Sequence, residues 1–222
     1  MNKSAFFFLV TLFITLSMGA WGWSASNHIN LGFASSVMKA NNSNMVNLKS
    51  NSALVCSFGR TLYSNNTIAN DIQYGFTFDV ANITYSQYEL MEIYYWKTET
   101  AEFKETNYSI ALGGELNFPV FKYLDLAVST KYLPGYSMLQ LNESSGKHNK
   151  YKGMSNAISL SCDISFSKIG LGLEYRLSSV KYKDNCTDSS ISDMYPEFWR
   201  RYGYDKGNVQ SNSILIYLKF NF

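Results

Sequence analysis

The sequence has little of what several large classes of protein require. Its 222 residues include three prolines, three cysteines and two histidines, and 16% are charged, with a formal net charge of +2. The cysteines, at positions 56, 162 and 186, do not make the even, regularly spaced set of a disulfide framework, so we interpret them as unpaired. The near-neutral balance gives no indication of nucleic-acid binding. Without a Gly-rich phosphate loop or a cluster of metal-ligating residue types, we expect no cofactor and no metal.

Long apolar runs are also missing beyond the first residues. Lys3 precedes a short apolar run over 5–16, and the small residues Gly19, Ala20 and Gly22 follow it, a pattern typical of a secretory signal peptide. We expect cleavage after Gly22, or less favourably after Ala20, which leaves one mature domain over 23–222. An uncleaved anchor is the alternative, but the run is shorter than the ~20 residues of a spanning helix. Any other membrane crossing would therefore need a β-barrel.

Strict alternation is what the sequence does have, most clearly over residues 211–222. Every second residue there is large and apolar, namely Ile214, Ile216, Leu218, Phe220 and Phe222, and those between are mostly polar. A period of two predicts a strand with one apolar face. Phe222 belongs to that face, which suits the aromatic girdle of a membrane barrel better than the fraying end of a soluble domain.

The same alternation predicts seven earlier strands. They cover about 28–38, 52–64, 71–86, 105–118, 123–134, 154–166 and 169–183. Long polar connectors (39–51, 87–104, 135–153 and 184–210, the third entered through Pro134-Gly135) alternate with short turns. Short turns on one side and long loops on the other are typical of outer-membrane barrels.

The terminal strand resembles the C-terminal signature strand of bacterial outer-membrane β-barrels. The whole mature chain is similar to small eight-stranded members, of the outer-membrane protein A and X type or the Bacteroidetes-type barrel domain. The resemblance implies an all-β, eight-stranded antiparallel up-and-down transmembrane barrel in the outer membrane of a Gram-negative bacterium, surrounded by outer-membrane lipid and lipopolysaccharide. It also implies that Ile214, Ile216, Leu218, Phe220 and Phe222 are read by the barrel assembly machinery. Alternation alone leaves open a soluble exported barrel or sandwich with its apolar face inside.

An outward apolar face puts the polar set of the strands into the lumen. Its charged members are Asp79, Glu115, Asp125, Lys131, Asp163, Glu174, Arg176 and Lys219. Buried acids and bases must pair, so we interpret them as a structural ion network. Eight strands enclose a lumen that side chains can fill, so we expect a plugged barrel and not a general porin.

The long loops hold the candidate recognition residues. Aromatic side chains near arginine suit a surface ligand or a glycan, and they are Tyr94, Trp96, Tyr195, Phe198, Trp199, Arg200, Arg201 and Tyr202. The plainer interpretation is that they pack on one another at the outer girdle. Loops 87–104 and 184–210 lean acidic and loops 39–51 and 135–153 lean basic, an alternation around the rim that favours loop–loop pairing over a single-sign field.

No catalytic residue is predicted, and we expect a non-enzymatic protein. The rival is a rim enzyme acting on lipid A or phospholipid. His148 with Ser144 or Ser145 and Glu143 supplies the residue types, but in one stretch without a supporting motif. The other histidine, His28, is expected beside the periplasmic interface.

Overall fold

The computed structural model describes residues 23–39, 48–68, 72–94, 97–143, 148–183 and 208–222, and in these it forms a closed barrel of eight antiparallel strands in chain order. They are β1 (Trp23–Lys39), β2 (Leu48–Thr67), β3 (Gln73–Tyr94), β4 (Lys97–Phe121), β5 (Leu124–Glu143), β6 (His148–Phe166), β7 (Ile169–Lys183) and β8 (Asn208–Asn221). No helix in this part of the chain has the length and apolarity needed to cross a membrane. The proposed signal peptide, 1–22, lies outside the described residues.

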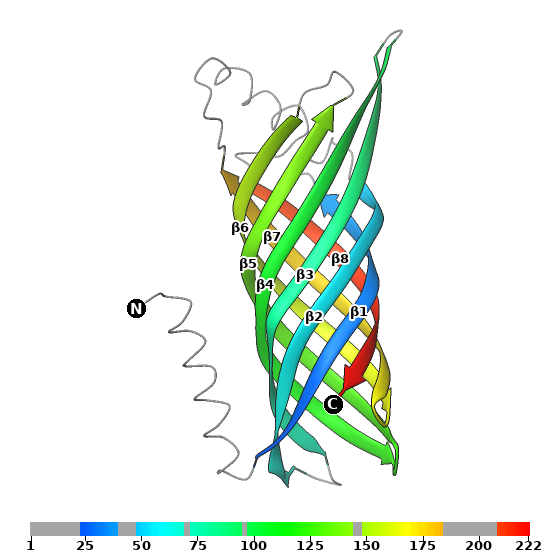
Figure 1. The fold of residues 1–222 in the computed structure, drawn as a ribbon, viewed down its shortest axis with the longest axis vertical. Helices are drawn as coiled ribbons and strands as arrows, with labels where there is room; N and C mark the ends of the chain where they lie inside the picture. Colours follow the sequence, from blue (N-terminus) through cyan, green and yellow to red (C-terminus); the bar gives the residue numbers. More distant parts are fainter. Residues whose placement is uncertain (1–22, 40–47, 69–71, 95–96, 144–147, 184–207) are drawn as a thin grey trace, which may run out of the picture.

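The barrel closes between its first and last strands. β8 pairs with β1 from His28↔Asn221 to Lys39↔Gln210. Below this ladder the backbones of Asn27 and Phe222 exchange hydrogen bonds of 3.1 and 3.0 Å. Closure pairs the backbone groups of both outermost strands, which is the condition for strands to stand in lipid. The predicted eight-stranded up-and-down barrel is confirmed (Figure 1).

The prediction of long loops over 87–104 and 135–153 is wrong, because most of these residues form strands. Residues 87–94 and 97–104 form the upper parts of β3 and β4, a hairpin that projects beyond the rest of the barrel (Figure 1). Residues 135–143 form the upper part of β5 and residues 148–153 the upper part of β6, and Pro134 lies inside β5. It pairs with Asn156 on β6, while the β4–β5 ladder is interrupted from Ser109↔Gly135 to Leu112↔Tyr132. The missing proline N–H therefore falls where no ladder bond is made.

A bulge in β3 changes which of its residues point into the lumen. Asp79 pairs with Gly59 and Ala81 pairs with Phe58, so Val80 is the extra residue, and both Val80 and Ala81 are exposed. Such a bulge moves the side chains beyond it by one position. Uninterrupted alternation from Asp79 would point Ala81 inward, but Ala81 is exposed and Asn82 takes the inward place.

Apolar side chains cover the outside of the lower barrel and form what we call the apolar belt. On β6, β7 and β8 the outward residues are apolar over 158–166, 169–177 and 214–222, and nearly all of them are exposed. Eight residue steps cover roughly 27 Å along a strand, or roughly 21 Å along the axis at a tilt of about 40°. Cys56 and Cys162 lie exposed on this face and are free, as predicted. The soluble alternative needs the opposite arrangement and does not fit.

The polarity inverts toward the end that carries the long hairpins, the extracellular end in barrels of this kind. Seven strands each place an apolar side chain of 2% exposure or less inside the barrel there, and we call this set the apolar ring: Met38, Tyr88, Phe103, Leu139, Tyr151, Val180 and Val209. Outward positions at the same level, such as Lys104, Lys152, Ser179 and Lys181, are polar. A barrel that stands in water needs its apolar core inside, so the inversion marks where the strands leave the lipid.

Gly59 offers a test of how tightly the lumen is filled. A β-carbon added there would lie 2.2 Å from Asp79 Oδ1, 2.5 Å from the Phe78 carbonyl oxygen and 2.8 Å from His28 Nε2. We expect Gly59→Ala to cost about 1–3 kcal/mol of folding free energy through overpacking. Gly114→Ala is the control, because its nearest new contact is 4.0 Å away. Urea titration in detergent micelles, followed by the heat-dependent gel shift, measures both, and equal losses would contradict the packing described.

Candidate functional site

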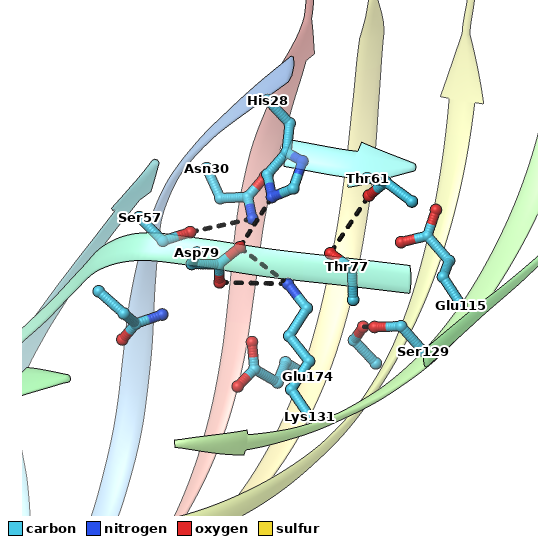
Figure 2. A network of polar contacts seen from close by, with 12 residues as sticks. His28, Asn30, Ser57, Thr61, Thr77, Asp79, Glu115, Ser129, Lys131 and Glu174 are labelled. Carbon is cyan, nitrogen blue, oxygen red and sulfur yellow. Dashed lines mark hydrogen bonds and ion pairs between the residues drawn. The ribbon is translucent and has the colours of Figure 1, made fainter. Parts of the chain in front are cut away.

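Asp79 is the centre of the first of three ion clusters in the lumen. Its carboxylate accepts hydrogen bonds from Lys131 Nζ at 3.2 and 3.3 Å, and its Oδ1 lies 2.9 Å from His28 Nε2 (Figure 2). The three residues come from β3, β5 and β1, so the cluster ties three separate strands across the interior. His28 lies toward the lower end of the barrel, as expected, where it pairs with Asn221, but its side chain is buried in the lumen and does not face the interface. His28 has an even residue number in β1, as do the inward residues Asn30 and Ser36, and this shared period of two is the signal that sequence reasoning overlooked.

Lys219 of β8 organises the second cluster between two carboxylates. Its Nζ lies 2.9 Å from Asp163 Oδ2 on β6 and 3.7 Å from Glu115 Oε2 on β4. Tyr217 donates its hydroxyl hydrogen bond to Asp163, and Tyr63 donates to Glu115. One ammonium and two phenols thus satisfy two buried acids, which would otherwise be costly to keep from water.

Arg176 of β7 makes the third cluster. Its Nε donates to Glu174 Oε1 at 2.9 Å, and its Nη1 donates across the lumen to Asn82 Oδ1 at 3.2 Å and Thr84 Oγ1 at 2.9 Å. A guanidinium has five N–H groups in a rigid fork, which lets one side chain bind both walls of the lumen.

A buried carboxylate that sequence reasoning missed lies above these clusters. Glu105 is 7% exposed and accepts hydrogen bonds from Tyr182 at 2.7 Å, Ser137 at 3.0 Å and Tyr88 at 3.3 Å. Between Glu105 and Arg176 is a cavity of about 30 Å³ lined mostly by serine, threonine and asparagine side chains. At ~10–15 Å³ for each water, it has room for roughly two or three. Its small size is consistent with a filled lumen.

The predicted interior set divides into seven residues that lie in the three clusters and one that does not. The seven are Asp79, Glu115, Lys131, Asp163, Glu174, Arg176 and Lys219. Asp125 is only half-buried and joins no ion pair with another described residue, so its assignment to the network is wrong. It is the second residue of β5, next to the lower turn, where water can solvate it.

The predicted recognition residues cannot be placed in the same way. Trp96, Tyr195, Phe198, Trp199, Arg200, Arg201 and Tyr202 lie outside the described residues, and of Tyr94 only the backbone is described, as the last residue of β3. Ser144 and Ser145 also lie outside, as do the side chains of Glu143 and His148.

The predicted assembly strand is β8 with the final residue. The five apolar residues of the predicted signature, Ile214, Ile216, Leu218, Phe220 and Phe222, are all exposed on the outer face. The Phe222 ring stacks on Phe58 of β2, with centroids 6.5 Å apart. The apolar belt is thus continuous across the closing strand. Recognition of this strand by the assembly machinery stays a prediction.

Charges on the outer face of the upper β3–β4 hairpin neutralise one another. Lys104 Nζ lies 2.9 Å from Glu102 Oε2, and Glu102 also accepts hydrogen bonds from Gln87 and Asn142. The hydrogen bond from Lys104 lowers the pKa of the Glu102 carboxyl, and the same bond raises the pKa of Lys104. Among the side chains that the structure describes, no group of three or more His, Cys, Asp or Glu is arranged to hold a metal ion.

No protein-family model and no curated protein matches the sequence. Among solved structures, the chain is similar to Ail, the attachment invasion locus protein of Yersinia pestis, at 13% identity over 90% of this chain and 99% of that one, with a TM-score of 0.49. It is also similar to Neisserial surface protein A, at 14% identity over 90% of this chain and 99% of that one, with a TM-score of 0.47. A third similar structure is the Escherichia coli outer membrane protease OmpT, at 11% identity over 89% of this chain and 96% of that one, with a TM-score of 0.40. These structural neighbours are small outer-membrane β-barrel proteins. At such TM-scores the likeness does not enter the functional argument, which rests on the chain's own residues.

Those residues define the class of protein. A closed eight-stranded sheet, an exposed apolar belt and a lumen of paired charges together make a transmembrane β-barrel.

Removing one member of an ion cluster tests its structural role. Lys131→Met leaves Asp79 buried with a reduced set of partners, and we expect a loss of about 3–5 kcal/mol in folding free energy. Lys104→Met is the matched control, because its pair with Glu102 is partly solvated and contributes little. Both are measured by urea titration in micelles. If Lys131→Met is as stable as the control, the cluster does not hold the barrel together.

Proposed function

We propose that this protein is a non-enzymatic integral outer-membrane barrel of a Gram-negative bacterium, with a sealed lumen and a structural or surface-recognition role at its extracellular end. The observation that carries the proposal is the filling of the lumen. Three ion clusters join opposite walls through the part enclosed by the apolar belt, and the apolar ring closes the part above it. A barrel closed in this way has no route for general diffusion of solutes.

A sealed lumen moves the function to the outer end. There the β3–β4 hairpin continues past the last β2–β3 pair, Ser50↔Tyr88, and past the last β4–β5 pair, Ala101↔Glu143. The segment 195–202 connects β7 to β8 and is therefore tethered to the same end. Its aromatic and arginine residues are our candidates for contact with a surface ligand or a glycan, together with Tyr94, the last residue of β3, and Trp96, which precedes β4 in the sequence.

The rival, a rim enzyme acting on lipid A or phospholipid through His148, gains no specific support from the described contacts. The described lumen carboxylates are bound by cations or hydroxyl groups, and no described contact joins any one of them to both a histidine and a serine. If any lipid-modifying activity is found, His148→Ala decides between the two, because a loss of activity in a folded barrel would favour the enzyme.

Conductance tests the sealed lumen. Pure refolded protein in a planar bilayer should give no stable, large ohmic channels, because the ion clusters and the apolar ring block the lumen. A water-filled porin in the same bilayer serves as the positive control. Stable large channels from this protein would show that the lumen opens and that the proposed role is wrong.

Binding by intact barrels tests the recognition residues. The double variant Trp96→Ala and Trp199→Ala should lose at least tenfold in binding to cells or arrayed glycans, since aromatic anchors commonly contribute more than about 1.4 kcal/mol. Tyr136→Ala, which removes an exposed aromatic ring from the outer face of β5, is the control and should bind normally. The heat-dependent gel shift monitors folding. Loss of assembly in the double variant would instead place these tryptophans in a packing cluster.

A further inference from the structure

Three exposed lysines stand together on the outer face of the barrel, above the apolar belt. Lys150 and Lys152 belong to β6, and Lys181 belongs to β7. Lys181 pairs in register with Met154, two positions from Lys152, so these two lysines are diagonal neighbours on one face. We call these three lysines with Met154 the lysine patch.

The patch has no acidic neighbour among the described side chains. Outward positions of β5–β8 around it and below it are Tyr136, Met138, Gln140, Asn156, Ser179, Gln210 and Asn212. Lys152 is paired in register with a further lysine position, Lys183. Like charges on facing strands destabilise a sheet, and on the β3–β4 hairpin the corresponding lysine is neutralised by Glu102. The lysine patch therefore needs an anion that the described chain does not supply.

Its height relative to the apolar belt indicates where that anion lies. The Tyr132 hydroxyl donates to Asn156 at 2.7 Å, and Asn212 donates to the Tyr175 hydroxyl at 3.2 Å, so these phenols turn polar tips toward the upper border of the belt. Lys181 is four residues above Leu177, the last apolar belt residue of β7, which is roughly 13 Å along the strand. A lysine side chain reaches back over part of that distance toward the border. The Lys181 ammonium group thus lies at the level of lipid headgroups, and Lys152 and Lys150 continue the patch farther from the belt along β6.

Two exposed methionines favour an amphiphilic ligand over a small free anion. Met154 is 65% exposed and Met138 is 37% exposed, and they face outward beside the lysines. Exposed thioether side chains adapt to irregular apolar partners. A small soluble anion would use the charges and leave these apolar surfaces in water, whereas a lipid headgroup with acyl chains below it covers both.

We infer that the lysine patch binds the phosphate groups of a phosphorylated glycolipid in the extracellular leaflet, with Lys150, Lys152 and Lys181 on the phosphates and Met154 on the apolar part. This inference rests on the proposed outer-membrane location and is independent of any recognition by the loops. It assigns a lipid-binding role to the outer wall of β6 and β7, where the barrel would hold one lipid beside it.

The test uses the full mature chain folded in detergent and titrated with bisphosphoryl lipid A, with bound lipid counted by native mass spectrometry. The triple variant Lys150→Gln, Lys152→Gln, Lys181→Gln should bind on the order of 100-fold more weakly, about fivefold for each lysine removed near an anionic surface. The triple Arg variant should bind like the wild type. A matched control, Lys122→Gln with Lys168→Gln, removes exposed lysines at the opposite end and should also bind normally.

Two ligand controls identify the source of the anion. Lipid A without phosphates should bind wild type as weakly as the triple Gln variant binds bisphosphoryl lipid A, and inorganic phosphate at equal concentration should not compete. Equal binding by wild type and folded triple Gln variant, or full competition by inorganic phosphate, would overturn the inference while leaving the barrel proposal intact. A chain that does not fold in detergent or enter lipid at all would instead count against the proposed location.

Discussion

The closed ring of backbone hydrogen bonds between β8 and β1 is the constraint on which the rest of the structure depends. Lipid offers no partner to an open sheet edge, so the strands can stand in a bilayer only as a cylinder. Eight strands make that cylinder narrow, and its interior must hold side chains. Those side chains are polar because the outward set is apolar, and buried charges must then pair. The ion clusters around Asp79, Lys219 and Arg176 are therefore a consequence of the closed, narrow barrel.

The same strands meet two solvents along their length. In the apolar belt leucine, isoleucine and phenylalanine face outward, and serine, glycine and charged residues face inward. Above the belt the arrangement reverses, with the apolar ring inside and lysine, glutamine and serine outside. Each part obeys the same rule, that apolar surface avoids water. The level of reversal locates the membrane border, and it makes the exposed lysines of β6 and β7 stand where headgroup phosphates lie.

Period-two alternation predicted the strands, their number and the outward face, because the lipid imposes the pattern on every crossing. It also placed seven of the eight charged residues that were assigned to the lumen. The prediction failed where the strands leave the lipid. In the upper hairpins the apolar residues Phe103, Leu139 and Tyr151 face the interior and the polar residues face water, which is the reverse of the pattern in the belt, so alternation with an apolar outer face does not identify these strands. Asp125 was misplaced because alternation does not tell a lumen position from its open end, and the bulge at Val80 adds a residue that no local signal marks. His28 had the correct phase and was overlooked.

Lipid exposure along the outer wall tests the central claim most directly. Cys162 is a native residue of the apolar belt, and Lys181 lies above it on the neighbouring strand. A spin label is placed on Cys162 alone, or on a single Lys181→Cys, with the other cysteines replaced by serine. In a bilayer, we expect the label at 162 to collide with oxygen and to be shielded from a water-soluble nickel chelate. The label at 181 should show the reverse. Equal nickel access at both sites would contradict a membrane-spanning belt that ends below the lysine patch.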